Sequence, residues 1–396
     1  MNPNSEQKNN ITKTSINSNK MDEIKEDMKL RHDIRVITFN LLSPDTTRPE
    51  WFPYVDKNHL SFPNRVERVK DLMKSFMKVN FIICLQELNK AWVDNIEQIF
   101  KDNNYDFHYS TYKNNEMGVG IAYPKNHYDL LEIDRHRCAD TVREICSRME
   151  TETFRDRIDE IDKTIITDLT EASKSDNILL TLLLGAKYFG KTVNKNLVIS
   201  TYHTPCKFNF KYWIPAHVHA CKKRVSDLRR IWNEKYSNTE SIVLAGDFNL
   251  IPSSPAYRLL IDVDDDDDDI IEVKNDSSNL QMQPLVSCQE KQVTNEQQLD
   301  IIKNMKSAYA LVNQNLDEKF RSAYFVCHGQ EPKYTNVTLQ ADKTFIECLD
   351  YIVINKSVDV RSATVGLTVD DPTKTAYPTR LCPSDHLPMS ASLRIL

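Results

Sequence analysis

The chain has 396 residues, of which 40% are hydrophobic and 27% charged, and its formal net charge is −6. No apolar run approaches the about 20 residues of a membrane-spanning helix, and an acidic balance does not by itself indicate a nucleic-acid binder. Asp262 and Asp264–Asp269 supply seven of the negative charges, so the rest of the chain carries a formal charge of +1. This acidic run is interpreted as a solvated loop, with a metal-binding or autoinhibitory segment as the alternative. The nine cysteines are scattered without close pairs, which indicates reduced thiols and a cytoplasmic or nuclear location.

Residues 1–32 are polar and contain no apolar segment of the kind found in signal peptides, so we expect a disordered tail there. Strand-like runs begin at residue 34, which predicts one domain over residues 33–396. Several of these runs carry or end in polar residues, and Ser384-Asp385-His386 precedes the final one. The runs are IRVITFN (34–40), FIICLQE (81–87), NLVISTYH (196–203), SIVLAGDFN (241–249), FIECLDYIVIN (345–355) and LPMSASLRIL (387–396).

Amphipathic helix patterns alternate with these strands. Apolar residues recur at helical spacing from Pro63 to Met77 and again over 217–235. This alternation predicts an α/β or α+β fold. Two segments, near 138–176 and 262–298, resemble insertions into the pattern: the first is charged and predicted to be helical, and the second is acidic and predicted to be a long loop.

Some of the polar strand ends have ordinary structural explanations. Asn40 could cap a turn, Gln86 and Glu87 could end a strand at the surface, and His203 could be a hydrogen-bonded core histidine. Each of these residues, taken alone, therefore leaves a structural and a functional interpretation open.

Asp247 and Asn249 are a stronger signal. In an extended strand, residues i and i+2 project from the same side, so this pair sets a carboxylate beside an amide while Phe248 points to the core. Asp350 stands within an apolar run, where an unpaired carboxylate is costly to bury. Asp385 and His386 set a second carboxylate beside an imidazole, so a His–Asp pair plus a metal ligand is a possible arrangement.

The order of these motifs resembles the endonuclease/exonuclease/phosphatase superfamily. TFN, QE, a strand-terminal His, GDFN, LDYI and SDH follow one another in this order from about Ile34 to Leu396, with the two insertions uncovered. The resemblance implies a four-layer α/β/β/α sandwich of the DNase I type, with the active site at one end.

The resemblance also implies a metal site. Glu87 is expected to be the central Mg²⁺ ligand, with Asn40 and Asp385 beside it; one or two ions are possible, and Mn²⁺ is an alternative. Mg²⁺ prefers a few carboxylates and several waters, and nothing in the His and Cys spacing suggests zinc.

The remaining motifs are expected to supply the catalytic groups. By the same resemblance, Asp247 orients or deprotonates the attacking water, and Asn249 holds the phosphate or the water. His203 is expected to contact a phosphate oxygen. His386, paired with Asp350, is expected to stabilise the negative charge that builds on the phosphate.

The tract GQEPKYTNVTLQADKTFIECLDYIVIN (329–355) is similar to the deadenylase-like branch of the superfamily, which includes nocturnin, the Angel proteins and the 2′-phosphodiesterase. The similarity implies substrate contacts from Asn336 and base stacking on Phe345, although Phe345 could equally begin a core strand. Lys207 and Phe208 belong to a basic and aromatic segment that suits a flexible single strand. Basic residues over 222–230 could extend a phosphate track or form the solvated face of a helix.

We therefore predict a Mg²⁺-dependent phosphodiesterase, a 3′-to-5′ exoribonuclease of the poly(A) type that releases 5′-nucleotides from single-stranded RNA. The alternatives are a phosphatase or phosphodiesterase on a small nucleotide, an inositol phosphate or a lipid head group, and an inactive scaffold. Segment 114–125 lacks the Asp-Gly pair of many deadenylases, which leaves the substrate open. No leucine-rich repeats precede the domain, so docking through such a module is not expected.

Overall fold

The computed structural model describes residues 33–112, 114, 117–149, 164–188, 191–262, 295–311, 318–340 and 344–396. The predicted tail over residues 1–32 lies outside them, as do the middle of the first predicted insertion and most of the second, including Asp264–Asp269. Contacts unite Ile34–Leu396 as one compact unit. None of the helices within the described ranges is both long and apolar enough to cross a bilayer.

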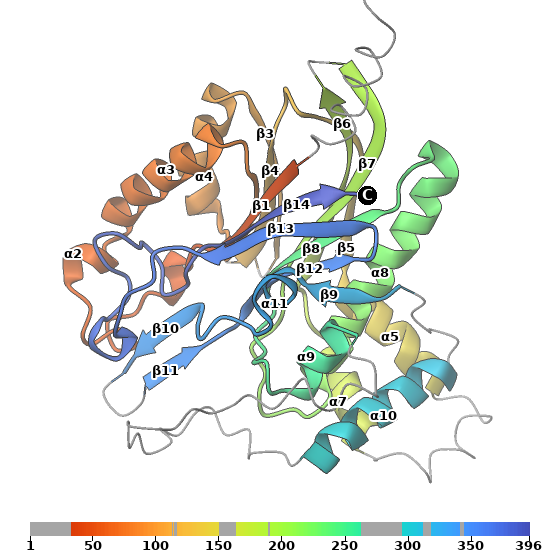
Figure 1. The fold of residues 1–396 in the computed structure, drawn as a ribbon. Helices are drawn as coiled ribbons and strands as arrows, with labels where there is room; N and C mark the ends of the chain where they lie inside the picture. The colour runs from red at the N-terminus through yellow and green to blue at the C-terminus, as the bar shows by residue number, and fades with distance from the viewer. Residues whose placement is uncertain are drawn as a thin grey trace, which may run out of the picture. The chain divides into compact units, whose positions relative to one another are not determined.

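Two sheets form the centre of this unit (Figure 1). Parallel pairs, β1 with β2 and β7 with β8, combine with antiparallel neighbours in each sheet. A separate pair, β10 (Asn336–Leu339) with β11 (Thr344–Glu347), lies outside them. Sheet 1 has the order β13 (Val358–Val365), β14 (Met389–Ile395), β1 (Asp33–Asn40), β2 (Ile82–Gln86), β4 (Met117–Pro124), β3 (Tyr105–Tyr112). Sheet 2 has the order β5 (Tyr128–Arg137), β6 (Ile178–Tyr188), β7 (Lys191–His203), β8 (Ser241–Asp247), β12 (Asp350–Asn355), β9 (Phe320–Ser322).

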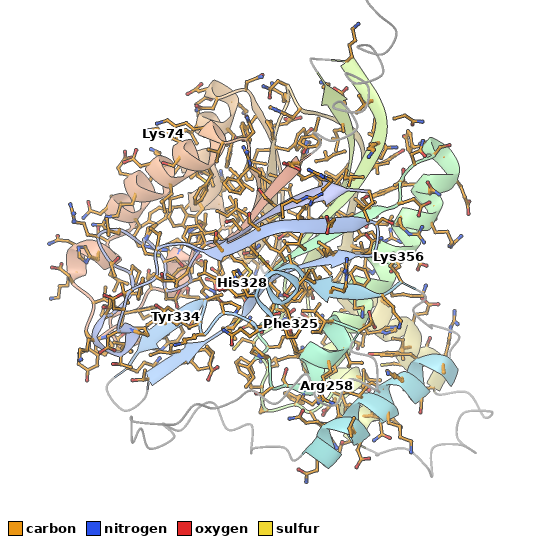
Figure 2. All side chains as sticks on the ribbon, viewed as in Figure 1. Lys74, Arg258, Phe325, His328, Tyr334 and Lys356 are labelled. Atoms are coloured by element: carbon orange, nitrogen blue, oxygen red, sulfur yellow. The ribbon has the colours of Figure 1, made fainter. Side chains whose placement is uncertain are left out.

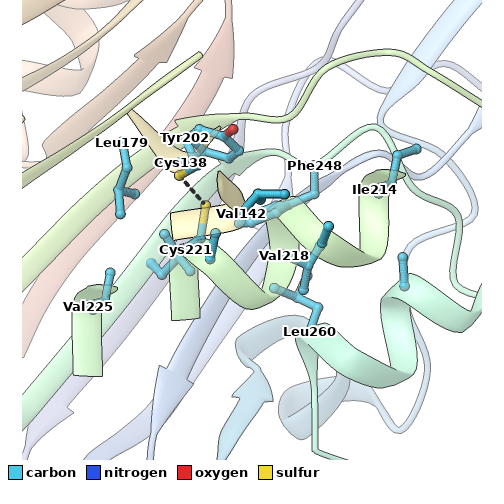
Figure 3. Close-up of a cluster of buried hydrophobic side chains, with 14 of the residues drawn as sticks. Cys138, Val142, Leu179, Tyr202, Ile214, Val218, Cys221, Val225, Phe248 and Leu260 are labelled. Atoms are coloured by element: carbon cyan, nitrogen blue, oxygen red, sulfur yellow. Dashed lines mark hydrogen bonds between the residues drawn. The ribbon is translucent and has the colours of Figure 1, made fainter. Parts of the chain in front are cut away.

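Three apolar clusters separate four layers and confirm the predicted α/β/β/α sandwich. Successive side chains of a strand point to opposite faces, so Ile82 and Cys84 pack between the sheets while Ile83 and Leu85 face the helices over sheet 1. The third cluster lies between sheet 2 and its helices, where Phe248 is fully buried (Figure 3). Sheet 1 is covered by α3 (Phe62–Lys78) and α4 (Lys90–Asp102), and sheet 2 by α5 (Cys138–Met149), α7 (Thr164–Ala172), α8 (Trp213–Tyr236), α9 (Pro255–Leu260) and α10 (Asn295–Leu311).

The helices predicted from periodicity are present with shifted ends. The pattern from Pro63 to Met77 lies within α3, where Pro63 occupies the first turn as expected for a residue without an N–H. The pattern over 217–235 lies within α8, which begins earlier, at Trp213. Pro215 lies in the first turn of this helix, where proline is tolerated. Two helices, α5 and α7, occur in the first predicted insertion, and α10 begins inside the segment predicted as a long loop.

The apolar run 345–355 was predicted as strand-like throughout, and this is wrong: it divides into β11 and β12. At the break, the hydroxyl of Thr335 accepts hydrogen bonds from the backbone N–H of Leu349 (2.9 Å) and of Asp350 (3.0 Å). The N–H of Phe248 donates to the carbonyl of Leu349 (2.9 Å). These contacts turn the chain, so that Asp350 becomes the first residue of a strand instead of its middle.

The remaining elements are short and lie around the sheets. Near β10, the hydroxyl of Tyr334 donates to the carbonyl of Val369 (2.9 Å), which fixes the start of this strand to the segment after β13 (Figure 2). These short elements are η1 (Pro44–Thr46), α2 (Lys57–Leu60), α11 (Ala323–His328) and η5 (Pro372–Lys374).

A glycine is required where β7 and β8 approach most closely. A Cβ atom on Gly246 would lie 2.0 Å from the carbonyl oxygen of Tyr202, a backbone atom that cannot rotate away. We expect Gly246→Ala to lower the free energy of unfolding by about 1–3 kcal/mol or more. Gly366→Ala is the control, because its Cβ would meet only ordinary contacts at 3.5 Å. Urea unfolding of both variants tests this, and equal stability would contradict the close approach.

Candidate active site

Three strands of sheet 2 place polar side chains at one edge. β7 ends at His203 and β8 at Asp247, and these two residues are paired in the parallel register. On the other side of β8, Asp350 begins β12 and pairs with Asp247 in the antiparallel register. All three side chains are buried or nearly so. The register therefore explains how residues nearly 150 positions apart in sequence reach one row.

Sheet 1 contributes Asn40, the last residue of β1, and Glu87, which directly follows the parallel strand β2. Glu87 has a positive φ of 56°, which turns the chain immediately after the strand. Its carboxylate accepts hydrogen bonds from the N–H of Ser43 (2.7 Å, to Oε2) and from the Asn40 amide (3.0 Å, to Oε1). The side-chain oxygen of Asn40 accepts from the N–H of Leu42 (2.9 Å). The turn interpretation of Asn40 is thus correct for its oxygen, while its nitrogen serves the site.

Side chains join the two sheets at this edge. The Asn40 amide donates to Glu87 and also to Oδ2 of Asp247 (2.9 Å). Beneath it, the amide of Gln86 donates to the hydroxyls of Thr38 (3.0 Å) and Thr201 (2.9 Å). Gln86 is fully buried, so the expectation of a surface strand end is wrong for this residue.

Asp247 and Asn249 lie together, but not because the strand stays extended. β8 ends at Asp247, and Asn249 has a positive φ of 47°. The two residues are held by a hydrogen bond from the Asn249 N–H to Oδ1 of Asp247 (2.9 Å). Phe248 is fully buried, as predicted. Both oxygens of Asp247 therefore accept hydrogen bonds, which fix the carboxylate in one orientation.

The Ser384-Asp385-His386 segment is held against β10. The N–H of Val337 donates to the carbonyl of Asp385 (2.9 Å), and Asn336 forms an isolated bridge with His386. His386 Nδ1 lies 2.8 Å from Oδ2 of Asp350, and its Nε2 lies 3.6 Å from Oδ2 of Asp247. The predicted pair of His386 with Asp350 is therefore present. It links the segment before β14 to sheet 2.

Charged side chains lie close together at the site, and they shift the pKa values of their neighbours. Burial alone would lower the pKa of His386, but Asp350 and Asp247 raise this pKa well above its ordinary value. Burial raises the pKa of Asp385, and the carboxylate of Glu87 raises it further. A protonated His386 thus faces Asp247, whereas Glu87 and Asp385 form a region of negative charge.

His203 has an unsatisfied ring nitrogen. The amide nitrogen of Asn249 donates to the carbonyl of Thr204 (2.8 Å) and lies 3.1 Å from Nε2 of His203. In this arrangement Nε2 is the acceptor, so the proton of a neutral imidazole is on Nδ1. Within the described ranges, Nδ1 of His203 and Oδ1 of Asp350 are buried without a hydrogen-bond partner. Buried polar atoms are rarely left unpaired, so both atoms are available to a water or a ligand.

The residues predicted to bind substrate have different surroundings. Asn336 is buried, and its side-chain oxygen accepts from Thr338, whose hydroxyl also lies 3.3 Å from Oδ2 of Asp385. Phe345 lies on β11, opposite Thr338, and is half-buried. It therefore does not begin a core strand.

The segment after His203 is only partly exposed. Lys207 is exposed and its Nζ lies 5.9 Å from the ring centroid of Trp213, while Phe208 packs partly against the cluster over sheet 2. The basic residues farther along α8 are paired with acidic side chains, which favours a structural interpretation over a phosphate track. These pairs are Lys222–Asp262, Lys223–Asp227, Arg224–Asp134, Arg229–Glu240 and Arg230–Glu234.

Sequence reasoning missed two residues that shape the site. Thr335 places Asp350, as described above. Arg65 is fully buried, and it follows the predicted helix start by two residues. It shares the spacing of four with Val69 and Met73, so its position on the apolar face was visible in the sequence.

Comparison with known proteins shows the family of the chain. Residues 37–386 match the model of the Endonuclease/Exonuclease/phosphatase family. The chain belongs to this family. Members of the family hydrolyse phosphodiesters or phosphate esters and in general use a divalent metal ion.

Individual relatives are distant. The chain is 22% identical to Carbon catabolite repressor protein 4 homolog 4 of Arabidopsis thaliana, over 91% of this chain and 77% of the relative. Among solved structures, it is similar to ANGEL2, described as a 2′,3′-cyclic phosphatase, with a TM-score of 0.59 and 17% identity over 92% of this chain and 96% of that one. The human Nocturnin catalytic domain gives a TM-score of 0.52 and 15% identity over 93% and 96% of the two chains. At these identities the structural similarities show the fold alone.

The donor set fits a hard divalent cation. Glu87 and Asp385 supply carboxylates that repel one another in the absence of a cation, whereas Asn40 turns its amide nitrogen, which cannot bind a metal, toward Glu87. Oxygen donors of this kind suit Mg²⁺ or Mn²⁺. Asp247, Asp350 and His386 also have ligand atoms within 4.8 Å of one another. That second cluster is less suitable because the two carboxylates beside its imidazole raise the imidazole pKa, so a cation bound there would have to displace a proton.

The Asn40 amide can be tested without a substrate. We expect Asn40→Asp to destabilise the metal-free protein more than Asn40→Ala does. The alanine variant loses the hydrogen bonds, whereas the aspartate variant also buries a third carboxylate beside Glu87 and Asp247, at a cost of about 3–5 kcal/mol. Urea unfolding in EDTA measures the difference. Equal stability of the two variants would show that Asn40 does not separate these carboxylates.

Proposed function

We propose that the chain is a Mg²⁺-dependent phosphodiesterase that acts as a 3′-to-5′ exoribonuclease on single-stranded RNA of the poly(A) type and releases 5′-nucleotides. The observation that carries the proposal is one cluster that combines a carboxylate fixed by hydrogen bonds, an imidazole with a raised pKa and two further carboxylates, Glu87 and Asp385. Family membership and the similarity to a carbon catabolite repressor relative support the same chemistry.

Glu87 and Asp385 would hold the cation, with Asn40 beside them. The bound cation would supply Lewis-acid stabilisation of charge on the phosphoryl oxygens. The N–H of Ser43 donates to Glu87, and Arg65 donates to the carbonyl of Pro383, two residues before Asp385. These contacts restrict the segments that carry the two carboxylates.

Asp247 is the proposed water-orienting group. Its oxygens accept hydrogen bonds from Asn40 and from the N–H of Asn249, which fix the direction of the carboxylate. An anionic carboxylate in this position can accept a proton from an attacking water. The Asn249 side chain donates to Thr204 and lies against His203, so we assign it to positioning phosphate or water.

The two histidines would interact with the phosphate oxygens. His386 stays protonated through Asp350, so it can stabilise the charge that develops on a nonbridging oxygen. His203 has its Nδ1 free of a partner among the described residues, and a proton there could be donated to a phosphate oxygen. Both groups would act through charge or hydrogen bonding, without a covalent intermediate.

Half-buried Phe345 is the proposed stacking surface for a base. The strand that pairs with it, β10, also carries Asn336, which is bridged to His386. An aromatic ring connected to the phosphate site in this way suits an unpaired base, and such stacking contributes about 1–3 kcal/mol per base. Lys207 and Phe208 are proposed as further contacts to the single-stranded RNA.

A small nucleotide is the second candidate substrate. ANGEL2 is described as a 2′,3′-cyclic phosphatase, and its structure was solved with adenosine-2′,3′-vanadate. The same charged groups could serve a terminal cyclic phosphate. Inositol phosphates, lipid head groups and an inactive scaffold remain as outcomes of the test below.

Activity should depend on the metal ligands and on His386. We expect Glu87→Gln and His386→Ala each to lower the kcat for hydrolysis of 5′-labelled oligo(A) by about 100-fold or more, because each removes a group that stabilises developing charge. Lys74→Gln, on the exposed face of α3 (Figure 2), is the control and should keep wild-type activity. Gel analysis with Mg²⁺ or EDTA, and thermal unfolding of each variant, provide the measurements.

The same assay with other substrates separates the candidates. Stepwise shortening of oligo(A) with release of AMP supports the exoribonuclease. Intact oligo(A) together with turnover of adenosine 2′,3′-cyclic phosphate or an inositol phosphate would replace it with the second candidate. Inactivity on all three substrates in Mg²⁺ and in Mn²⁺ would favour the scaffold.

A further inference from the structure

Arg65 is an unusual member of the layer between α3 and sheet 1. Its side chain is fully buried, on the helix face that also carries Val69 and Met73. A guanidinium taken out of water is costly unless its donors are satisfied, and Nη1 of Arg65 has no hydrogen-bond partner within the described ranges. Its contacts should therefore reveal why a cation occupies a position where an apolar residue would suffice.

The guanidinium connects two loops of the candidate active site. Nε of Arg65 donates to the carbonyl of Pro383 (2.7 Å), and Nη2 donates to the carbonyls of Leu41 and Leu42. The central carbon of the guanidinium, Cζ, lies over the ring of Trp92, 5.2 Å from the ring centroid. Leu41 directly follows Asn40, and Pro383 precedes Asp385 by two residues. One side chain thus spans the loop after β1 and the segment before β14.

The first of these loops also places Glu87. Ser43 follows Leu42, and its N–H donates to Oε2 of Glu87 (2.7 Å). Arg65 therefore acts on Glu87 through Leu42 and Ser43, and on Asp385 through Pro383. These are the two carboxylates assigned to the cation, and they come from segments about 300 residues apart.

The charge of Arg65 and its hydrogen bonds affect a bound cation differently. Burial lowers the pKa of Arg65 to about 10, while Asp385 and Glu87 act to raise it, so the guanidinium stays charged at neutral pH. A fixed positive charge near the two carboxylates reduces their mutual repulsion but also repels a cation, so the contribution of Arg65 to affinity rests on the hydrogen bonds that place the two loops. Lysine could not replace these contacts, because one ammonium group lacks the planar fork that reaches both loops.

We propose that Arg65 is a positioning residue that sets the spacing of Glu87 and Asp385 and thereby the affinity of the site for a divalent cation. The identity of the two residues as metal ligands rests on the proposed function. The role of Arg65 does not require any particular substrate, so it can be measured by metal binding alone.

The test measures Mn²⁺ binding to the full chain by the loss of the free-ion signal in electron paramagnetic resonance. Arg65→Lys and Arg65→Met should each raise the dissociation constant about 10-fold or more, as is typical when a group that orients metal ligands is removed. Thermal unfolding verifies that each variant is folded at the measuring temperature, and the lysine variant keeps the test valid if the methionine variant does not fold.

Lys222→Met is the matched control. Lys222 is also a buried cation that donates to a carbonyl, that of Leu259 (2.6 Å), but it lies on α8 over sheet 2. The control should lose stability and keep the wild-type affinity for Mn²⁺. A wild-type affinity in both Arg65 variants, or an equal loss in Lys222→Met, overturns the proposal.

The outcome is separable from the proposed function. If the wild type binds Mn²⁺, if the Arg65 variants bind it weakly, and if no phosphodiester is hydrolysed, then the exoribonuclease assignment fails and the role of Arg65 stands. If the wild type hydrolyses oligo(A) and the Arg65 variants bind Mn²⁺ normally, then the role of Arg65 fails and the function stands. A wild type that binds no Mn²⁺ contradicts both.

Discussion

The amide of Asn40 connects the two halves of the candidate site, and the rest of the arrangement depends on it. Its nitrogen donates to Glu87 of sheet 1 and to Asp247 of sheet 2, residues that would repel one another as neighbouring carboxylates. A neutral donor with two hydrogens suits this position because it satisfies both acids and adds no charge. The sheets can therefore bring negative charge to one edge without losing their packing.

This constraint explains which residues of the candidate site come from each sheet. Segments of sheet 1 supply Asn40, Glu87, Asp385 and His386, whereas sheet 2 supplies His203, Asp247, Asn249 and Asp350. The His386–Asp350 pair crosses between the two groups, as does the Asn40–Asp247 bond. In the proposed function, Asp385 and Glu87 hold the cation, while Asp247 orients the attacking water. Buried polar bonds between the sheets, such as Gln86 to Thr201, hold this register in place.

Much of the candidate site was predictable because its residues belong to short motifs at strand ends. The order of TFN, QE, GDFN, LDYI and SDH indicated Asn40, Glu87, Asp247, Asp350 and His386, and alternation of strands and helices indicated the layers. The missing parts depend on contacts between distant segments. Nothing near Arg65 in the sequence announces a bond to Pro383, 318 residues away. The break between β11 and β12 likewise depends on Thr335, since Cys348 and Leu349, which lie at the break, are not typical turn residues.

The central claim is that Glu87 and Asp385, and not the cluster around His386, hold the divalent cation. Anomalous diffraction from crystals soaked in Mn²⁺ tests it most directly, because the ion is located without reference to any substrate. The account predicts an anomalous peak within coordination distance of the carboxylates of Glu87 and Asp385. A sole peak bound by Asp247, Asp350 and His386 would contradict the account.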